Sequence, residues 1–206
     1  MLSAMFPLVV VRCGLDAARQ VALDEPMIDI RLARPDDIDA LAQLKLETFR
    51  ETFIAGFAIP YPPADLAIFE EKAYSPASIA IELADAAITT WIAERDGRLL
   101  GYAKIGPCHL PHPEARPEHG ELYQLYVRGE AQGLGLGSLL LTHALDHLAV
   151  TRPGPVWLGV WSGNLKAQEV YVKRGFSKVG EYRFPVGTWY DEEYIFRRDQ
   201  RETGLS

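Results

Sequence analysis

The sequence predicts an α+β domain, that is, a mixed αβ fold with several hairpins. Three observations lead to this fold class. Several short segments alternate apolar and polar residues, as half-buried strands do. Other segments repeat apolar residues every three to four positions, as amphipathic helices do. The expected strands often follow one another directly, which argues against a regular alternation of parallel strands and helices.

The composition is that of an ordinary globular protein with a mild acidic excess. The 206 residues include 21 Lys plus Arg and 28 Asp plus Glu, which gives a net charge of −7. Hydrophobic residues make up 48% of the chain, so a domain of this size needs no metal or disulfide staples to fold. The acidity argues against nucleic acid and anionic membranes as partners. Cys13 and Cys108 are too few for a disulfide framework and fit a reducing cytoplasm.

The N-terminal segment differs from the rest of the chain. Its apolar stretch, residues 4–11, precedes Arg12, whereas a signal peptide has its positive charge first. No stretch approaches the roughly 18 apolar residues of a membrane span. Strong alternation begins only at Met27, so residues 1–26 are expected to be an extension, of leader or disordered type, and residues 27–206 the domain. We hypothesise that Met27 is the natural start.

In the first half of the domain, turn and cap residues mark the elements. Pro35 opens a helix whose first turn holds two aspartates, which suit a helix N-terminus. Asp96 and Gly97 form a two-residue hairpin signal. The expected elements are a strand at 28–33, a helix from Pro35, a helix at 63–73, and strands at 88–94 and 99–105.

In the second half, a broken loop and a capped helix set the boundaries. Residues 106–120 are rich in proline and histidine and follow neither period, so they are expected to be a loop. Asn164 and Gly175 have the residue types of an N-cap and of the position after a helix. The expected elements are strands at 121–127 and 155–161, helices at 136–150 and 164–175, and final strands at 176–184 and 189–197.

The glycine-rich segment at residues 132–138, QGLGLGS, lies between an expected strand and an apolar helix. Alternating glycines let the backbone approach a ligand closely, and N–H groups at a helix N-terminus bind phosphates. A flexible turn is the plain alternative. A Walker loop would need a lysine before Ser138, and a dinucleotide fingerprint would need a third glycine at that position. Both of those motifs therefore fail.

At these residues the chain resembles the GNAT superfamily of acyl-CoA-dependent N-acetyltransferases. The signature Q/R-x-x-G-x-G/A is met by Gln132, Gly135 and Gly137, after a strand that ends in LYV. A second signature is supplied by Asn164, Ala167 and Tyr171, followed by KRGF at 173–176, and the resemblance spans residues 28–197. Residues 157–161, 49–53 and the tail with Phe184, Gly187, Asp191 and Glu192 resemble the bacterial spermine/spermidine acetyltransferase subgroup.

The resemblance implies a central mixed sheet, splayed between the strands at 121–127 and 156–161, with helices on both faces. Acetyl-CoA would be the cosubstrate, without a metal, and its pantetheine would lie between the two strands like a strand itself. A backbone N–H at a bulge of the first of these strands would polarise the thioester carbonyl. The implied cofactor-binding residues are Leu125, Tyr126, Val127, Gln132, Gly133, Leu134, Gly135, Leu136, Gly137, Ser138, Asn164, Ala167 and Tyr171.

Two residues are candidates for catalysis. Tyr171 would protonate the coenzyme A thiolate, since a phenol is a suitable donor; a core tyrosine is the plain alternative. Glu121 lies eleven residues before Gln132, where some members place the glutamate that takes the amine's proton; a solvated strand-end glutamate is its alternative. Another branch places a glutamate five residues before the asparagine, where this chain has Gly159. A water wire without a protein base stays open.

Other polar residues are less informative. The histidines of the loop at 106–120 and Cys108 have no standard zinc spacing, so a broken surface loop, or a lining of the acceptor site, is expected. A second set of histidines is expected on a solvated helix edge. The residues after position 188 form either an ordinary strand turn or an acidic–aromatic amine pocket. These candidates are His109, His112 and His119; His143 and His147; and Trp189, Tyr190, Asp191 and Glu192.

The predicted function is transfer of the acetyl group of acetyl-CoA to a primary amine of a small, polyamine-like molecule, by direct attack in a ternary complex. A protein or peptide N-acetyltransferase and a non-catalytic acyl-CoA sensor are the alternatives. Tyr171 argues against the sensor, which has no need of an acid for the thiolate. Dimers are common in the superfamily, and the final strands offer an exposed edge for a homodimer.

Overall fold

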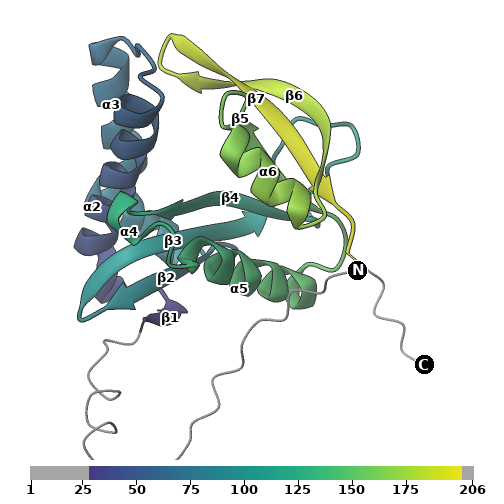
Figure 1. The fold of residues 1–206 in the computed structure, drawn as a ribbon, viewed down its shortest axis with the longest axis horizontal. Coiled ribbons are helices and arrows are strands. Elements are labelled where there is room, and N and C mark those ends of the chain that lie inside the picture. Colours follow the sequence, from purple (N-terminus) through teal and green to yellow (C-terminus); the bar gives the residue numbers. More distant parts are fainter. Residues whose placement is uncertain (1–27, 201–206) are drawn as a thin grey trace, which may run out of the picture.

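The computed structural model describes residues 28–200, which form a seven-stranded sheet with helices around it (Figure 1). The expectations for residues 1–26, Met27 and Cys13 lie outside the described residues. The strand order is β1-β2-β3-β4-β5-β7-β6, and all neighbours are antiparallel except β4 and β5. This confirms the predicted α+β class. The strands are β1 (Asp29–Leu32), β2 (Thr89–Arg95), β3 (Arg98–Pro107), β4 (Gly120–Val127), β5 (Val156–Trp161), β6 (Ser177–Val186) and β7 (Trp189–Arg198).

The helices agree with the sequence pattern in most places. The helix expected from Pro35 begins as a short 3₁₀ turn, and a seven-residue π-helix continues it. One helix, α4, was not predicted; the Ser75 side chain caps it by accepting a hydrogen bond from the Ser78 N–H. The helical segments are η1 (Pro35–Asp37), α2 (Ile38–Phe49), η2 (Arg50–Gly56), α3 (Pro63–Tyr74), α4 (Pro76–Ala84), η3 (Gly129–Ala131), α5 (Leu136–Thr151) and α6 (Leu165–Lys173).

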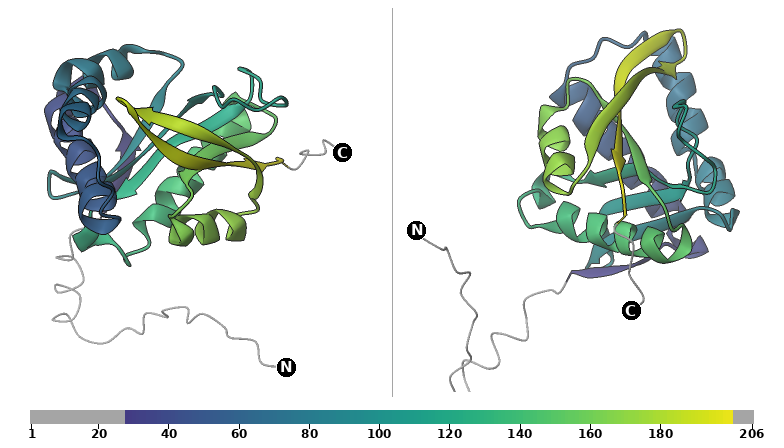
Figure 2. Two further views of the ribbon diagram at one scale, coloured as in Figure 1. Left: turned by 90° about the horizontal axis from the view of Figure 1, so that it is seen from above. Right: turned by 90° about the vertical axis from the view of Figure 1, so that its right-hand side faces the viewer.

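Helices cover both faces of the sheet. Figure 2 shows α2, α3 and α4 gathered on one side and α5 and α6 on the other. Successive strand residues point to opposite faces, so Ile92 packs in the core beneath α2 while Ala93 packs in the core beneath α5. Tyr102 and Ala103 divide in the same way. Both faces of β2 and β3 are therefore buried.

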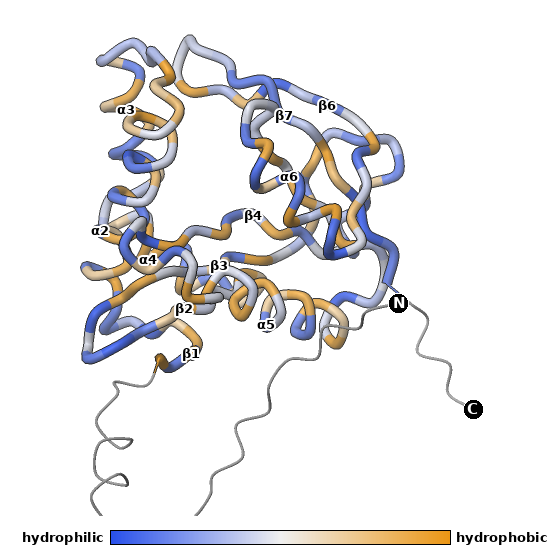
Figure 3. The backbone as a smooth tube through the Cα atoms, in the orientation of Figure 1, coloured by the Kyte–Doolittle hydropathy of each residue, from blue (hydrophilic) through white to orange (hydrophobic). Residues whose placement is uncertain are grey.

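The β2–β3 hairpin turns where the sequence predicts it. Asp96 and Gly97 have φ angles of 53° and 75°, the left-handed conformation that a tight two-residue turn of this kind requires. This turn is hydrophilic, whereas α5 and the strands that it covers carry long hydrophobic stretches (Figure 3). Within the part of the chain that the structure describes, no helix combines the length and apolar character needed to cross a membrane.

The sheet is split at its centre, as predicted. β4 and β5 pair only through Gly120–Leu122 and Val156–Leu158, in register and parallel. Beyond these residues the strands diverge, and in Figure 1 the β6–β7 hairpin rises away from β2, β3 and β4. The register between β3 and β4 shifts so that Tyr123 is the extra residue of a bulge. Within residues 28–200, the edge of β4 from 123 to 127 therefore has no strand beside it on the β5 side.

Candidate active site

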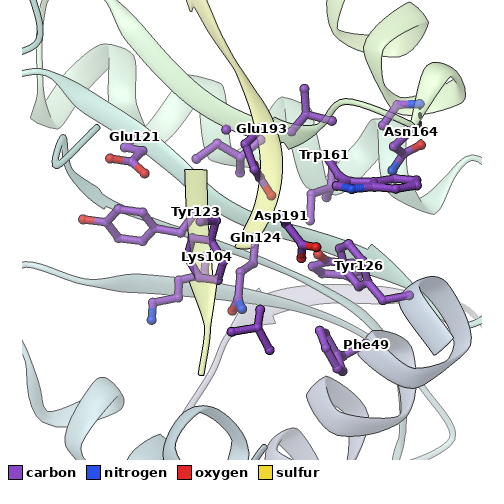
Figure 4. Close-up of a pocket in the computed structure, with 18 of the residues that line it drawn as sticks. Phe49, Lys104, Glu121, Tyr123, Gln124, Tyr126, Trp161, Asn164, Asp191 and Glu193 are labelled. Atoms are coloured by element: carbon purple, nitrogen blue, oxygen red, sulfur yellow. Dashed lines mark hydrogen bonds between the residues drawn. The ribbon is translucent and has the colours of Figure 1, made fainter. Parts of the chain in front are cut away.

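A cavity of about 300 Å³ opens where β4 and β5 diverge (Figure 4). Its floor comes from the two splayed strands, and its walls come from α2, η2, α3, α6, β6 and β7. The cavity combines carboxylates with aromatic rings. The lining residues with polar or aromatic side chains are Phe49, Phe53, Phe69, Tyr74, Lys104, Glu121, Tyr123, Gln124, Tyr126, Trp161, Asn164, Tyr171, Tyr182, Phe184, Asp191 and Glu193.

One wall of the cavity is a cluster of aromatic rings centred on Phe49. The ring centroid of Phe49 lies 5.1 Å from that of Phe53 and 5.3 Å from that of Phe69. Phe53 lies on the π-helix η2, which continues α2, and the ring of Phe57 after η2 packs against Trp161 with centroids 4.5 Å apart. Aromatic faces attract cations, so this wall suits an ammonium as well as an apolar chain.

Glu121 is a buried carboxylate that holds the loop after β3 in place. Its Oε2 accepts a hydrogen bond of 2.7 Å from the His109 N–H. The Cys108 thiol and the Leu110 N–H also act on it as donors. Burial nevertheless outweighs these donors and raises the pKa of Glu121 to about 7. A carboxylate with such a pKa can accept a proton near neutral pH.

Asp191 is also buried, and both of its oxygens are already engaged. Oδ2 accepts a hydrogen bond of 2.5 Å from the Tyr61 hydroxyl, and Oδ1 accepts one of 3.0 Å from Trp189 Nε1. Burial raises the pKa of Asp191. Asp191 thus fixes the cavity wall as well as adding negative charge.

The sequence pattern grouped Asp191 with Glu192, and the structure corrects this to Glu193. Residues 191 and 193 share one face of β7, so Glu193 lines the cavity, while Glu192 is exposed and pairs with Arg183 at 2.9 Å. Burial raises the pKa of Glu193 to about 7. The period of two along the strand is the signal that could have identified Glu193. In Figure 4, Asp191 and Glu193 point into the cavity from β7, and Glu121 lies apart from them.

Lys104 is the only basic residue among those lining the cavity. Its Nζ lies 2.7 Å from Oε2 of Glu82 on α4, and Glu82 also binds the buried Lys45 at 2.5 Å. Burial lowers the pKa of Lys45 to about 8. Glu82 faces both lysines and so offsets the charge of Lys104 only in part, while three carboxylates line the cavity against this one ammonium group.

Tyr171 lies on α6 with its side chain at the cavity. The ring is buried and packs edge-on against Phe176, with centroids 5.9 Å apart. Burial raises the pKa of the hydroxyl, and the nearby Glu193 raises it further. Asn164 caps the helix as predicted, because its side chain accepts a hydrogen bond of 3.1 Å from the Ala167 N–H. Asn164, Ala167 and Tyr171 all line the cavity.

The glycine-rich segment lies at the far end of β4 and leads into α5. Gly133 and Gly135 have φ angles of +86° and +79°, and a Cβ atom at either position would have nothing within 4 Å. Gly135 is the N-cap of α5, so the first N–H groups of that helix are open to an anion. Gln132 donates a hydrogen bond of 3.3 Å to the Val127 carbonyl. Of the other residues expected here, Leu134 is exposed, Leu136 is buried, and Gly137 and Ser138 lie in the first turn of α5.

Four of the five histidines pack against tryptophans, and His109 packs against Tyr123. His119 Nδ1 accepts a hydrogen bond of 3.0 Å from Trp157 Nε1, and the His112 ring packs 5.1 Å from Trp157. His109 Nδ1 lies 3.0 Å from the Tyr123 hydroxyl, so the loop does reach the cavity lining. His143 and His147 pack against Trp91 rather than facing solvent alone. Among residues 28–200, no three His, Cys, Asp or Glu side chains are grouped so that they could hold a metal ion.

Comparison with known proteins agrees with this geometry. The model of the acetyltransferase (GNAT) family matches residues 43–176. An uncharacterized N-acetyltransferase of Lactobacillus delbrueckii subsp. lactis is 28% identical over 149 residues, which are 72% of this chain and 86% of the relative. One from Mycobacterium bovis is 29% identical over 163 residues, which are 79% and 97%. The PaiA N-acetyltransferase of Thermoplasma acidophilum, crystallised with coenzyme A, has the same fold, with a TM-score of 0.66, 20% identity, and coverage of 84% of this chain and 99% of that one.

Proposed function

We propose, since the chain belongs to the acetyltransferase (GNAT) family and is an acetyl-CoA-dependent N-acetyltransferase, that its acceptor is the primary amine of a small, polyamine-like molecule. The observation that supports this acceptor is the set of side chains that line the cavity between β4 and β5. Three carboxylates line it against one basic residue, Lys104, which is paired with Glu82. A small cation with an apolar chain suits such carboxylates and aromatic faces.

On the donor side, the free edge of β4 would bind the pantetheine arm. Strand residues 125–127 would offer backbone hydrogen bonds in place of the missing strand neighbour, and the N–H groups at the Tyr123 bulge would polarise the thioester carbonyl. The segment from Gln132 to Ser138 would take the pyrophosphate at the N-terminus of α5. Asn164, Ala167 and Tyr171 would line the thiol end of the arm.

Two residues move protons in the proposed reaction, Glu121 at the amine and Tyr171 at the thiolate. Glu121 takes a proton from the acceptor ammonium through water and passes it to solvent. The neutral amine then attacks the thioester carbon, a C–N bond forms and the C–S bond breaks. Tyr171 gives its proton to the departing thiolate and regains one from the nitrogen that becomes the amide. One proton per turnover therefore reaches solvent.

The proposal includes the domain assignment and the setting of the enzyme. Residues 27–206 would form the acetyltransferase domain, with residues 1–26 as an extension. The low cysteine count supports a cytoplasmic enzyme. β6 is an edge strand of the sheet, and pairing of a second copy along it would give a homodimer.

Release of coenzyme A thiol from acetyl-CoA tests the acceptor class. The panel should hold spermidine, spermine and 1,4-diaminobutane, arylamines, and peptides with free N-termini. We expect the polyamines to be acetylated with a higher kcat/KM than the other acceptors of the panel. Turnover of peptides alone would replace the small-amine proposal with a peptide acetyltransferase. Binding of acetyl-CoA without turnover of any acceptor would favour a sensor.

A further inference from the structure

We propose that Glu193 is the residue that binds the ammonium group of the acceptor and holds it where β4 and β5 begin to diverge. This assignment rests on the proposed small-amine function. It separates the residue that binds the amine from Glu121, the residue that takes the proton. The sequence pattern and the family signatures pointed to neither Glu193 nor its neighbour in space, Tyr182.

The first argument is that the other two cavity carboxylates are already held by protein donors. Glu121 accepts hydrogen bonds from the loop after β3, and both oxygens of Asp191 accept one from a ring hydroxyl or indole N–H. Glu193 has only a long hydrogen bond of 3.4 Å from the Tyr182 hydroxyl, and it forms no ion pair among residues 28–200. Of the three carboxylates, it has the most free acceptor capacity.

The second argument is position. Gly159 on β5 comes directly after Leu158, the last residue of β5 that pairs with β4. A Cβ atom at Gly159 would lie 2.6 Å from the Tyr182 hydroxyl and 3.0 Å from Oε2 of Glu193. The absent side chain is therefore what lets the Glu193 carboxylate lie over β5, at the point where the two strands begin to diverge.

The third argument is charge. The titratable groups that face Glu193 are all acidic or phenolic, and none is a cation. They are Asp191 on β7, Tyr182 on β6, Tyr171 on α6, Tyr126 on β4, and Tyr61 before α3, while the residues of β5 beside Glu193, Gly159 and Trp161, are not titratable. A buried carboxylate without a cation is costly, and an ammonium would offset that cost.

Together these arguments divide the work at the reacting nitrogen. Glu193 binds the ammonium directly, between Tyr182 and Tyr171, and the aromatic wall accommodates the carbon chain of the acceptor. Because Tyr171 and Glu193 line the same cavity, the amine held there is close to the proposed proton donor for the thiolate. Glu121, held farther away by its loop, accepts the proton through water (Figure 4).

The test is steady-state kinetics of Glu193→Gln, with Glu192→Gln as the matched control. Both variants remove one carboxylate charge from β7, but Glu192 points to the opposite face. The acceptor is whichever member of the panel of polyamines, arylamines and peptides the wild type acetylates best. Glu193→Asp, which keeps the charge on a shorter side chain, and the KM for acetyl-CoA report whether the fold and donor site are intact.

We expect the KM for the acceptor to rise about 10- to 100-fold in Glu193→Gln, because the ammonium loses one charged hydrogen-bonding partner. The kcat at saturating acceptor and the KM for acetyl-CoA should stay close to wild type, Glu193→Asp should recover part of the affinity, and Glu192→Gln should match wild type. An acceptor KM that stays at the wild-type value in Glu193→Gln would overturn the assignment, whether or not kcat falls. If the best acceptor in the panel is a peptide, the small-amine proposal is refuted. The role of Glu193 is still decided by the comparison of acceptor KM values, so the two proposals fail independently.

Discussion

The hydroxyl of Tyr61 donates a hydrogen bond of 2.5 Å to Asp191, a residue 130 positions later in the chain. This bond joins the segment between η2 and α3 to β7, so it ties the aromatic wall of the cavity to its acidic wall. Trp189 completes the arrangement through its indole N–H. The shape of the cavity therefore depends on a contact between two parts of the chain that no local sequence pattern connects.

Replacing Tyr61 with Phe should loosen this wall. The ring would stay, but the buried Asp191 would lose a donor, which we expect to lower the free energy of unfolding by about 1–3 kcal/mol. Urea unfolding measures this change. Tyr190→Phe on the same strand is the control, since Tyr190 is exposed. Equal stabilities of the two variants would show that the Tyr61–Asp191 bond contributes nothing.

Replacing Tyr171 with Phe tests the proposed acid. The ring would still pack against Phe176, while the proton for the thiolate would be missing, so kcat should fall by about tens-fold or more. The KM for acetyl-CoA should change little. Thiol release at saturating substrates is the measurement, and Tyr194→Phe, a half-buried tyrosine outside the cavity lining, is the control. An unchanged kcat in Tyr171→Phe would refute the role.

The pH dependence of kcat tests Glu121. Burial raises the pKa of its carboxyl to about 7, so the group is protonated below that pH and is available as a base above it. The wild-type kcat should therefore fall as the pH drops below about 7 and level off above it. Glu121→Gln should lower the plateau and remove this limb. Persistence of the limb in Glu121→Gln would assign it to another group or to the water wire.

Replacing Gly135 with Ala tests the phosphate loop. The φ angle of +79° disfavours any residue with a Cβ, by about 1–2 kcal/mol. Gly97→Ala is a matched control, because Gly97 has φ +75° and equally open surroundings but lies in the β2–β3 turn. Calorimetric titration with coenzyme A should show weaker binding for Gly135→Ala only, although both variants lose stability. Equal affinities in the two variants would place the pyrophosphate elsewhere.

Local signals predicted most of the elements, while contacts between distant residues escaped prediction. Asp96 and Gly97 encode their turn within two positions, and Asn164 encodes the start of α6 within four, so both could be read from the sequence. Helix α4 was missed, and so was the π-helix η2, whose path the apolar period does not distinguish from that of an α-helix. These two helical segments lie on one side of the molecule, and no strong local sequence signal indicates them.

The candidate site shows the same division. Glu121 and Tyr171 could be named from spacing within the signatures, and both line the cavity. The period of two along β7 could have grouped Glu193 with Asp191, but its place in the cavity depends on the pairing of β7 with β5 and on the space that Gly159 leaves. Spacing along the chain led only to Gly159, which carries no carboxylate. In the structure, the carboxylate of Glu193 lies beside Gly159 and comes from β7.

Three residue pairs between β4 and β5 join the two parts of the described sheet. The half with β1 to β4 and α5 carries the glycine-rich segment, and the half with β5 to β7 carries Tyr182, Asp191 and Glu193. The second half also carries α6 with Tyr171, and the first half also carries the aromatic wall around Phe49, so both halves line the one cavity. A change in the angle between the halves at these three residue pairs would therefore alter both walls of the cavity together.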